Sequence, residues 1–593
     1  MEEFYDSTRY HFGSVDYSVF GFMLGLSALT GLYFGCKSRI WSKSQDQSLE
    51  EYLIGGRTLT CLPVAMSLVA SYISGVTVLG SPTEIYYFGS QYMLIVAAIF
   101  ISGTVITFVY LPVFCQLRVA SSYEYLEMRF STVVRIMASA FFVLDEIMFL
   151  PIIVYVPSLA FNQVTGCDIH IIGTIVTLIC IFYTFLGGLK AVVWTDTWQI
   201  IAMFLSTIMV IIIGTIYAGG PGPVFSKFSE GGRVILFDFN TSMYQRYTFF
   251  SVLIGGFTYW TSFNAVNQTM VQRYMSLPNY AKARKAVIFF TIGVSSFVWL
   301  CTYVGSLLYY EYSGCDPMVA GRITAADQLV PLYVMDSAGN LSGIPGLFIS
   351  GVFGASLSSL SVVLNSTAQV ILEDIIKGCL KKNPSEAKGK IIVKTIVLIL
   401  GAVALGGLYV VEHMGGVLEM ATAFTSIAAG TTFGIFTLGM VFPWVTSKGA
   451  IVGALAGMAI SSTITYGSEY MVATHQVVAH KLPVSIDDCY KYGVNTTMVD
   501  PVYPDESHIF PLFRLSYLWI TPIGVVTVIT VGLITTLLTG KNDIREMDPD
   551  LITPVAHWML PPESQRYRGA AKTAFLNRFS DRERMVQEMR LTE

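Results

Sequence analysis

The amino-acid sequence predicts an all-α integral membrane protein with about thirteen transmembrane helices. Two observations support this fold class. Hydrophobic residues make up 53% of the 593-residue chain and charged residues only 13%, whereas a soluble protein carries roughly 25% charged residues to cover its surface. The chain also contains repeated apolar runs of about 20 residues, the length that an α-helix needs to cross a hydrocarbon core of ~30 Å.

The apolar runs lie between a short acidic leader and a polar C-terminal tail. The first run is too long for the core of a signal peptide, so we expect it to be retained as a span. An odd number of spans places the two termini on opposite sides of the membrane. The predicted spans cover residues 17–36, 58–80, 90–114, 136–160, 168–186, 196–218, 247–266, 286–310, 346–375, 393–412, 418–440, 449–467 and 515–538.

The distribution of Lys and Arg between the loops predicts the orientation. Most of the 36 basic residues fall in alternate loops and in the C-terminal tail, which places these segments in the cytoplasm. We therefore expect a multi-pass protein of the plasma membrane with an extracellular N-terminus and a cytoplasmic C-terminus. Asn-x-Ser/Thr sequons begin at Asn240, Asn340 and Asn495, all in predicted extracellular loops, and are candidates for glycosylation.

Charge and motif content argue against several classes of function. A net charge of −4 gives no basic surface for nucleic acid. The sequence has no phosphate-binding loop, and its seven histidines fall in loops, tails or span edges, where they would not hold haem or metal in the membrane. We therefore expect neither a pump nor an enzyme. Cys167, Cys315 and Cys489 fall in predicted extracellular loops and allow one disulfide, whose pairing the sequence leaves open.

Three segments inside the predicted spans have unusual composition. Residues 70–89 combine Ser, Thr and Gly with Pro82, which favours either a broken helix that lines a cavity or close helix packing. Residues 354–366 contain a serine cluster, whose hydroxyls suit an alkali cation or bond their own helix. Residues 254–268 join two adjacent glycines to aromatic residues that line a cavity or face lipid.

Ionisable residues at membrane depth are costly and are therefore functional candidates. Asp145 and Glu146 lie in the fourth predicted span, Asp196 at the start of the sixth and Glu419 in the eleventh. Adjacent residues of an α-helix point about 100° apart. We therefore expect that Asp145 and Glu146 do not face the same pocket.

A set of motifs extends over most of residues 15–540. They are GSPTEIYYFG at 80–89, YEYLEMRF at 123–130, GGLKAVVWTDTWQ at 187–199, NQTMVQRY at 267–274, CDPMVAGRITAADQLVP at 315–331 and the serine cluster. In this order and spacing they resemble the sodium/solute symporter family, and within it the branch of the sodium-coupled monocarboxylate, multivitamin and iodide transporters. The full set is far more specific than any single motif.

The resemblance implies a LeuT-like core of two inverted five-helix repeats with discontinuous helices. Residues 1–57 would comprise the extracellular N-terminus, the first helix and the first cytoplasmic loop. The remaining parts would be a first repeat at 58–218, an extracellular loop at 219–246, a second repeat at 247–440, two closing helices at 449–538 that flank an extracellular loop at 468–514, and a cytoplasmic tail at 539–593.

The resemblance also implies functional residues. The family's sodium site combines carbonyls with hydroxyls, which here would come from Ala70, Ile73, Ala355, Ser358 and Ser359. Asp196 matches an acidic residue on the family's cytoplasmic sodium exit route. The substrate cavity would be lined by Tyr72, Thr77, Trp260, Thr261 and Glu419.

The implied function is Na⁺-coupled symport by alternating access, with small organic monocarboxylates as substrates: lactate- or pyruvate-like acids, or vitamins such as biotin and pantothenate. The implied partners are Na⁺, a small-molecule solute and the lipid bilayer. Thr77 fits the organic-anion members, whereas an ionised Glu419 in the cavity would repel an anion, and Ala421 lacks a hydroxyl for a second sodium. A neutral solute such as a sugar or inositol, or a sodium-gated sensor or channel, remains an alternative, and the oligomeric state is left open.

Overall fold

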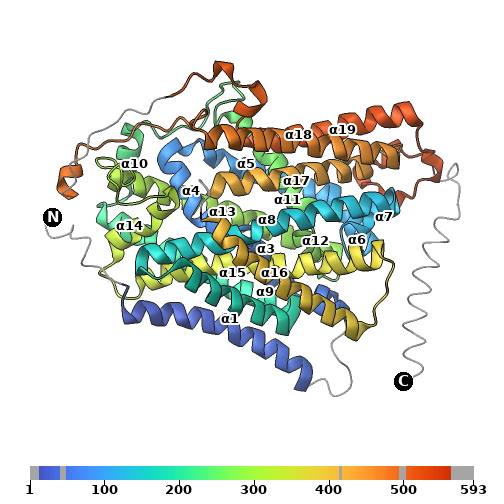
Figure 1. Cartoon of the computed structure of the whole chain (residues 1–593), viewed down its shortest axis with the longest axis horizontal. Helices are drawn as coiled ribbons and strands as arrows, with labels where there is room; N and C mark the ends of the chain where they lie inside the picture. Colours follow the sequence, from blue (N-terminus) through green and yellow to red (C-terminus); the bar gives the residue numbers. More distant parts are fainter. Residues whose placement is uncertain (1–11, 41–48, 413–416, 493–502, 563–593) are drawn as a thin grey trace.

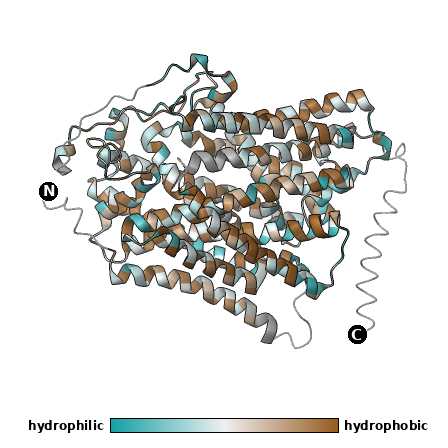
Figure 2. Ribbon diagram, viewed as in Figure 1, coloured by the Kyte–Doolittle hydropathy of each residue, from teal (hydrophilic) through white to brown (hydrophobic). Residues whose placement is uncertain are grey.

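The computed structural model describes residues 12–40, 49–412, 417–492 and 503–562, and all regular structure in these ranges is helical. The all-α prediction is confirmed for this part of the chain. The longest helices lie side by side, with most of their ends at two opposite ends of the molecule (Figure 1). The helices are rich in apolar residues, and polar residues gather toward the loops (Figure 2), as expected of a membrane protein.

The bundle combines long helices with short ones, numbered in chain order. They are α1 (Ser14–Ile40), α2 (Leu49–Ile54), α3 (Cys61–Tyr72), α4 (Gly75–Phe88), α5 (Ile95–Val105), α6 (Leu111–Leu117), α7 (Glu124–Arg129), α8 (Thr132–Thr165), α9 (Ile169–Tyr217), α10 (Pro221–Glu230), α11 (Gly256–Val266), α12 (Gln268–Met275), α13 (Tyr280–Tyr312), α14 (Leu329–Ala338), α15 (Ile344–Val370), α16 (Glu386–Val411), α17 (Val417–Val441), α18 (Ser447–Ala473) and α19 (Ile520–Thr539).

Nine helical segments among the described residues are long and apolar enough to cross a membrane. A tenth candidate, the pair Leu49–Arg57 and Cys61–Tyr72, is bent by 106° at a short break. The chain is therefore a multi-pass membrane protein. The nine are Ser14–Phe34, Ser90–Leu117, Thr132–Thr165, Ile169–Tyr217, Tyr280–Tyr312, Ile344–Cys379, Glu386–Val411, Ser447–Ala473 and Tyr517–Thr539.

Three interruptions shape the bundle. Helix α3 ends at Tyr72 and α4 begins at Gly75, with Ile73 in an extended conformation between them. Helix α9 covers both predicted spans 168–186 and 196–218, but it is kinked at Gly188, whose φ of 56° suits a residue without a side chain. Helices α11 and α12 are separated at Asn267, which is also extended. Two of these breaks lie in the segments that the sequence singled out.

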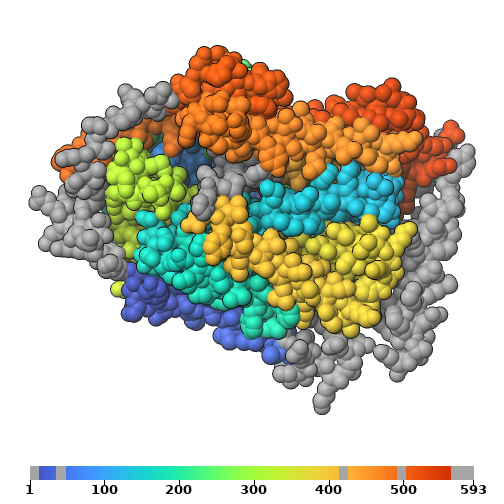
Figure 3. Space-filling view, viewed as in Figure 1, coloured from blue at the N-terminus to red at the C-terminus, as the bar shows by residue number. Residues whose placement is uncertain are grey.

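Helix α15 lies at the centre of the bundle. Its membrane-spanning window is 94% buried, far more than the other candidate spans. It packs against α9, α8, α1 and α3, and the space-filling view shows α8, α9 and α16 packed together on one face (Figure 3). The serine cluster of α15 therefore faces protein on all sides, and not lipid.

One end of the bundle carries α10, α14 and the loop before α19 (Figure 1). Cys315, after α13, forms a disulfide with Cys489, 174 residues later, while Cys167 remains a free thiol. The structure therefore resolves the pairing that the sequence left open. Asn240 and Asn340 are exposed, and Asn495 lies outside the described residues.

Candidate functional site

The break between α3 and α4 lies against the serine cluster of α15. The Ser358 hydroxyl lies 2.7 Å from the carbonyl oxygen of Ala70 and 2.9 Å from that of Ala355. The Ser359 hydroxyl lies 3.0 Å from the Ala355 carbonyl and 3.4 Å from that of Ser71. The structure thus brings four of the five predicted sodium-site residues into direct contact.

Close approach of the two helices depends on a glycine. A Cβ atom at Gly75 would lie only 2.5 Å from the Ser356 hydroxyl oxygen, so a larger residue there would require the Ser356 side chain to turn away or α4 to shift. Ile73, the fifth predicted residue, lies in the extended link two residues before Gly75 and is fully buried. Its carbonyl belongs to the interrupted backbone, where helical hydrogen bonds are lost.

The chemistry of this cluster suits an alkali cation. Its donors are backbone carbonyls and neutral hydroxyls, which are hard oxygen ligands. An interrupted helix leaves backbone carbonyls without their helical hydrogen bonds. Inside a membrane protein such backbone is tolerated only where it is buried or lines a cavity, and transporters use these carbonyls to coordinate Na⁺. The Ser358 hydroxyl contacts the Ala70 carbonyl, and the Ser359 hydroxyl contacts the Ala355 carbonyl. These hydroxyls and carbonyls would bind the ion together. The residues present therefore fit a Na⁺ ion.

Asp196, on α9, is fully buried and does not stand alone. Its carboxylate accepts a hydrogen bond from Ser67 at 2.5 Å and forms an ion pair with Arg273 of α12 at 3.3 Å. Arg273 also donates to Ser67 at 2.8 Å and to the Thr269 carbonyl at 2.7 Å. Both charged side chains have no exposed surface. The sequence motifs contained both residues, but only the fold shows that they pair.

Aromatic side chains enclose a small cavity beside the break. The Tyr72 ring lies 4.2 Å from the Trp260 ring, centroid to centroid, and Trp260 stacks on Phe290 at 5.4 Å. The cavity has a volume of about 40 Å³. Its lining residues come from five parts of the chain: Tyr72, Tyr92, Ile95, Gly256, Tyr259, Trp260, Ser426, Tyr517, Leu518 and Thr521.

The predicted substrate residues differ in their placement. Tyr72 and Trp260 line the cavity together. Thr261 instead donates hydrogen bonds to Ser102 of α5 and to its own helix, because the next residue of a helix points about 100° away. Thr77 is partly buried and does not line this cavity. The Glu419 side chain lies outside the described residues.

Several lining residues had no signal in the sequence patterns. Tyr517 and Thr521 come from the last helical segment, which the sequence analysis treated as a closing helix. Tyr92 precedes α5, and Ser426 lies on α17. Such residues are typical of ordinary apolar or aromatic spans, so only their three-dimensional arrangement identifies them.

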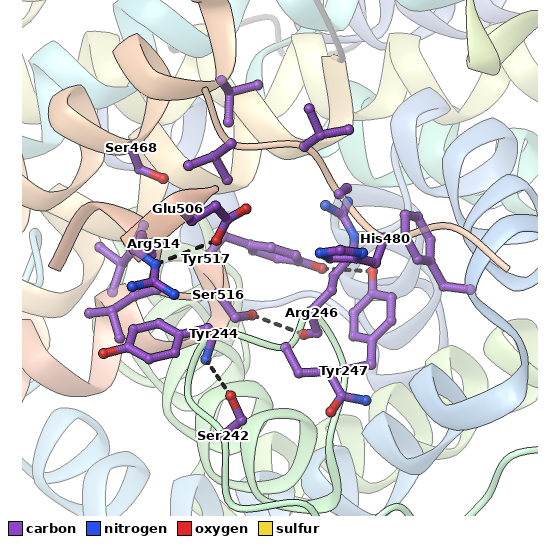
Figure 4. Close-up of a pocket in the computed structure, with 18 of the residues that line it drawn as sticks. Ser242, Tyr244, Arg246, Tyr247, Ser468, His480, Glu506, Arg514, Ser516 and Tyr517 are labelled. Atoms are coloured by element: carbon purple, nitrogen blue, oxygen red, sulfur yellow. Dashed lines mark hydrogen bonds and ion pairs between the residues drawn. The ribbon is translucent and has the colours of Figure 1, made fainter. Parts of the chain in front are cut away.

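A larger cavity of about 590 Å³ lies at the end of the bundle that carries the disulfide (Figure 4). Arg514 and Glu506 form an ion pair at its edge, at 3.4 Å. Tyr517 lines this outer cavity as well as the small aromatic cavity. Its side chain therefore forms part of the wall between the two.

A hydrogen-bonded network reinforces this wall. The Tyr247 hydroxyl lies 3.0 Å from that of Tyr517 and donates to Glu84 at 2.6 Å. Arg246 forms a bidentate ion pair with Glu84, at 2.9 and 3.1 Å. The arginine also lies over the Tyr517 ring, 5.2 Å from its centroid. The network joins α4, the segment before α11 and the start of the last helix.

Comparison with known proteins supports a common origin along most of the chain. The model of the sodium:solute symporter family matches residues 52–457. A sodium-coupled monocarboxylate transporter 1 of Xenopus laevis is 35% identical over 88% of this chain and 85% of its own length. A sodium-coupled monocarboxylate transporter 2 of Mus musculus is 34% identical over 92% and 87%. A sodium-dependent multivitamin transporter of Oryctolagus cuniculus is 36% identical over 92% and 85%.

Solved structures show the same fold. A Na⁺-coupled sialic acid symporter, 22% identical, superposes with a TM-score of 0.72 over 90% of this chain and 99% of that one. A nucleobase-cation-symport-1 family transporter, 11% identical, superposes with a TM-score of 0.52 over 87% of this chain and 96% of that one. Together with the match to the family model and to relatives over almost the full length, these findings show that the chain belongs to the sodium:solute symporter family.

Proposed function

We propose that this protein imports small organic monocarboxylates, such as lactate- or pyruvate-like acids, biotin or pantothenate, together with Na⁺ by alternating access. Na⁺-coupled symport is the activity of the family, and the names of the relatives at 34–36% identity supply the substrate class. The observation that carries the proposal is the contact between the broken helix α3–α4 and Ser358 and Ser359.

The proposed sodium site uses the carbonyl oxygens of Ala70, Ile73 and Ala355 and the hydroxyls of Ser358 and Ser359. Na⁺ entering from outside would replace the hydrogen bonds from these hydroxyls to the Ala70 and Ala355 carbonyls. The ion would thereby hold α15 against the α3–α4 break. The adjacent residue Tyr72 lines the aromatic cavity, so occupancy of the site would fix one wall of the cavity.

Asp196 is proposed to assist sodium exit toward the cytoplasm. Ser67 lies one turn before Ala70 and Ser71 on α3, and it connects the sodium site to Asp196. An ion that leaves along this face of α3 would meet the carboxylate and compete with Arg273 for it. The pairing keeps the buried carboxylate neutralised when no ion is present.

The aromatic cavity is proposed to hold the substrate, with Tyr72 and Trp260 covering its apolar part. No α4 residue lines the cavity in this conformation, but we propose that backbone amides at the start of α4 meet the carboxylate once the cavity widens, because the N-terminus of a half-helix attracts anions. The described conformation leaves only about 40 Å³ there, so substrate entry requires the cavity to widen. We assign the outer gate to Tyr517, Tyr247 and the Glu84–Arg246 pair, which separate it from the outer cavity.

Replacing Trp260 with Ala is expected to raise KM for the transported acid about tenfold. The ring contacts Tyr72 and Phe290 and lines the cavity, and truncation of a buried aromatic anchor in a binding site costs more than about 1 kcal/mol. Uptake at graded substrate concentrations measures the change. Trp299→Ala is the matched control, because that side chain is exposed on α13; an equal effect of both substitutions would contradict the cavity assignment.

The proposed topology has thirteen spans, with residues 58–218 and 247–440 as inverted five-helix repeats, an extracellular N-terminus and a cytoplasmic C-terminus in the plasma membrane. The correspondence of predicted spans with helices supports it, provided that α9 counts as two spans joined at Gly188. The Cys315–Cys489 disulfide and the two exposed sequons lie at the proposed extracellular end, the oxidising side.

Glycosylation tests this orientation. Asn240→Gln and Asn340→Gln are each expected to increase gel mobility by the equivalent of one glycan, because both asparagines are exposed on proposed extracellular loops. Glycosidase treatment of the wild-type protein should give the mobility of the double variant. Asn365→Gln serves as control, since this sequon is buried inside α15. Loss of a glycan from the control alone would contradict the orientation.

The function itself is tested by uptake and current in voltage-clamped oocytes, with and without Na⁺. Sodium-dependent uptake of radiolabelled lactate or biotin, with inward current, is the expected result and would choose between the two substrate groups. Transport of a neutral solute such as inositol instead would change the substrate class, and a sodium current without uptake would identify a sensor or channel. Surface labelling ensures that the protein is present in each case.

A further inference from the structure

Two adjacent carboxylates lie buried in the middle of α8. Asp145 is 9% exposed and Glu146 is 3% exposed. One carboxylate oxygen of each residue, Asp145 Oδ1 and Glu146 Oε1, is buried without a hydrogen-bond partner. Burying an ionised carboxylate in a membrane protein is costly unless a cation or a proton neutralises it.

The buried arginines of the neighbouring elements are already engaged elsewhere. Arg129 of α7 donates to the backbone carbonyls of residues 439–445. Arg135, on the same helix, pairs with Glu127 and Asp374. Arg273 of α12 pairs with Asp196. Among the described residues, no Lys, Arg or His forms an ion pair with either carboxylate of α8. A neutralising group from outside the chain is therefore required.

Asp145 of α8 lines a small space that residues of α11, the α11–α12 link and α17 also line. The space has a volume of about 10 Å³, enough for a single water-sized occupant. Its polar surroundings come from α11, from the link between α11 and α12, and from α17: Ser262, Asn267 and Thr432 line it as well. The Thr425 side chain lies within hydrogen-bonding reach of the Asp145 carboxylate. Glu146 does not line the space, as expected from their angular separation, but it lies within reach of Asn267.

The backbone at this place adds a further attraction for a cation. Helix α11 ends at Val266, and the chain is extended at Asn267 before α12 begins. Val266 and Asn267 both line the space, so the C-terminal end of α11 is directed at it. The C-terminus of a half-helix carries a partial negative charge and free carbonyl oxygens, which transporters use to bind cations.

We propose that Asp145 binds a second Na⁺ ion in the space between α8, α17 and the α11–α12 break. A carboxylate with neutral hydroxyl, amide and carbonyl oxygens is a suitable ligand set for Na⁺. Mg²⁺ and Ca²⁺ fit less well, since they need six or more oxygens and often keep several waters. A proton on Asp145 would also neutralise the carboxylate, but protonation would not need the adjacent space or the helix C-terminus directed at it.

This site is separate from the one at α3 and α15, and it lies beside the aromatic cavity. Tyr259 lines that cavity and lies near Asp145, and Ser426, next to Thr425, also lines it. An ion at Asp145 would therefore offset negative charge next to the bound substrate. The inference rests on the proposed Na⁺-coupled symport for the choice of ion.

The test is the number of Na⁺ ions bound per chain, measured with ²²Na⁺ on the purified full-length protein at equilibrium without substrate. At a Na⁺ concentration that just saturates the wild type, we expect two ions for the wild type, one for Asp145→Asn, one for Ser358→Ala and none for the double variant. Glu373→Gln is the matched acidic control, because Glu373 pairs with Lys377 just beyond the end of α15, and it should retain both ions.

Several outcomes overturn the proposal. If Asp145→Asn binds as many ions as the wild type, the space holds water or Asp145 holds a proton, and a loss of proton uptake in this variant would identify the proton. If the wild type binds a single ion, and if Ser358→Ala but not Asp145→Asn removes it, the second site is absent. The proposed Na⁺-coupled symport is then not contradicted. If the wild type binds none, the proposed function fails as well.

A second variant covers the case in which Asp145→Asn does not fold. Ser262→Ala removes one hydroxyl from the space and leaves the carboxylate in place. It is expected to weaken binding of one of the two ions about tenfold and to leave the other unchanged. Two unchanged dissociation constants in this variant would overturn the proposal.

Discussion

Replacing Ser358 with Ala is expected to weaken the activation of uptake by Na⁺ by about 10–100-fold while surface expression is retained. The hydroxyl contacts the carbonyls of Ala70 and Ala355, so its loss removes one proposed ligand and the direct bond between α3 and α15. Hydrogen-bond-like contacts to a charged group contribute about 1.5–3 kcal/mol each, which corresponds to the expected range. Uptake at graded Na⁺ concentrations and fixed substrate measures it.

Ser366→Ala is the matched control for this experiment. Ser366 is a fully buried serine on the same helix, but its hydroxyl bonds only the carbonyls of its own helix, Val362 and Val363. Its substitution should change the Na⁺ dependence less than twofold. An unchanged Na⁺ dependence in a well-folded Ser358→Ala protein would show that the sodium site lies elsewhere.

Replacing Arg273 with Gln is expected to destabilise the protein by about 3–5 kcal/mol, because it leaves the Asp196 carboxylate buried without a partner. Both side chains are fully buried, and Arg273 also donates to Ser67 and to the Thr269 carbonyl. Thermal unfolding of the purified protein should show a marked loss. The double variant Asp196→Asn/Arg273→Gln should recover most of it, since no charge then remains in the pair.

The comparison variant for the buried pair is Lys377→Gln. Lys377 and Glu373 form a partly exposed pair one turn apart, and such pairs contribute less than about 1 kcal/mol. Equal losses for Arg273→Gln and Lys377→Gln would contradict the assigned role of burial. If the double variant is as unstable as Arg273→Gln alone, the arginine acts through its other hydrogen bonds and not through Asp196.

Much of the fold could be predicted from local sequence. The apolar runs are helical where the structure describes them, although one is broken and two are joined in α9, because a chain in hydrocarbon must satisfy its backbone hydrogen bonds within the segment. The break in residues 70–89 was also signalled by small and hydroxyl-bearing residues. The sequence did not indicate that two predicted spans join in the single helix α9. The chain is kinked at Gly188 there, with no polar loop between the two spans.

The candidate site was only partly predictable. Family motifs placed Ala70 and Ser358, and the structure brings them together. They did not show that Thr261 faces α5, because motif spacing does not fix the rotation of a helix against its neighbours. Nor did they indicate Tyr517, whose contribution to the cavity depends on how the last helix packs.

The sequence by itself determined that this is a helical membrane protein and where most of its apolar helices lie, and it indicated which residues could form a cation site. These properties depend on composition and on neighbours within one or two turns. The tertiary structure decided which of those residues meet: Asp196 with Arg273, Cys315 with Cys489, and Asp145 with the end of α11. Such contacts join positions 77–174 residues apart or different helices, and they depend on helix packing, which local sequence patterns do not specify.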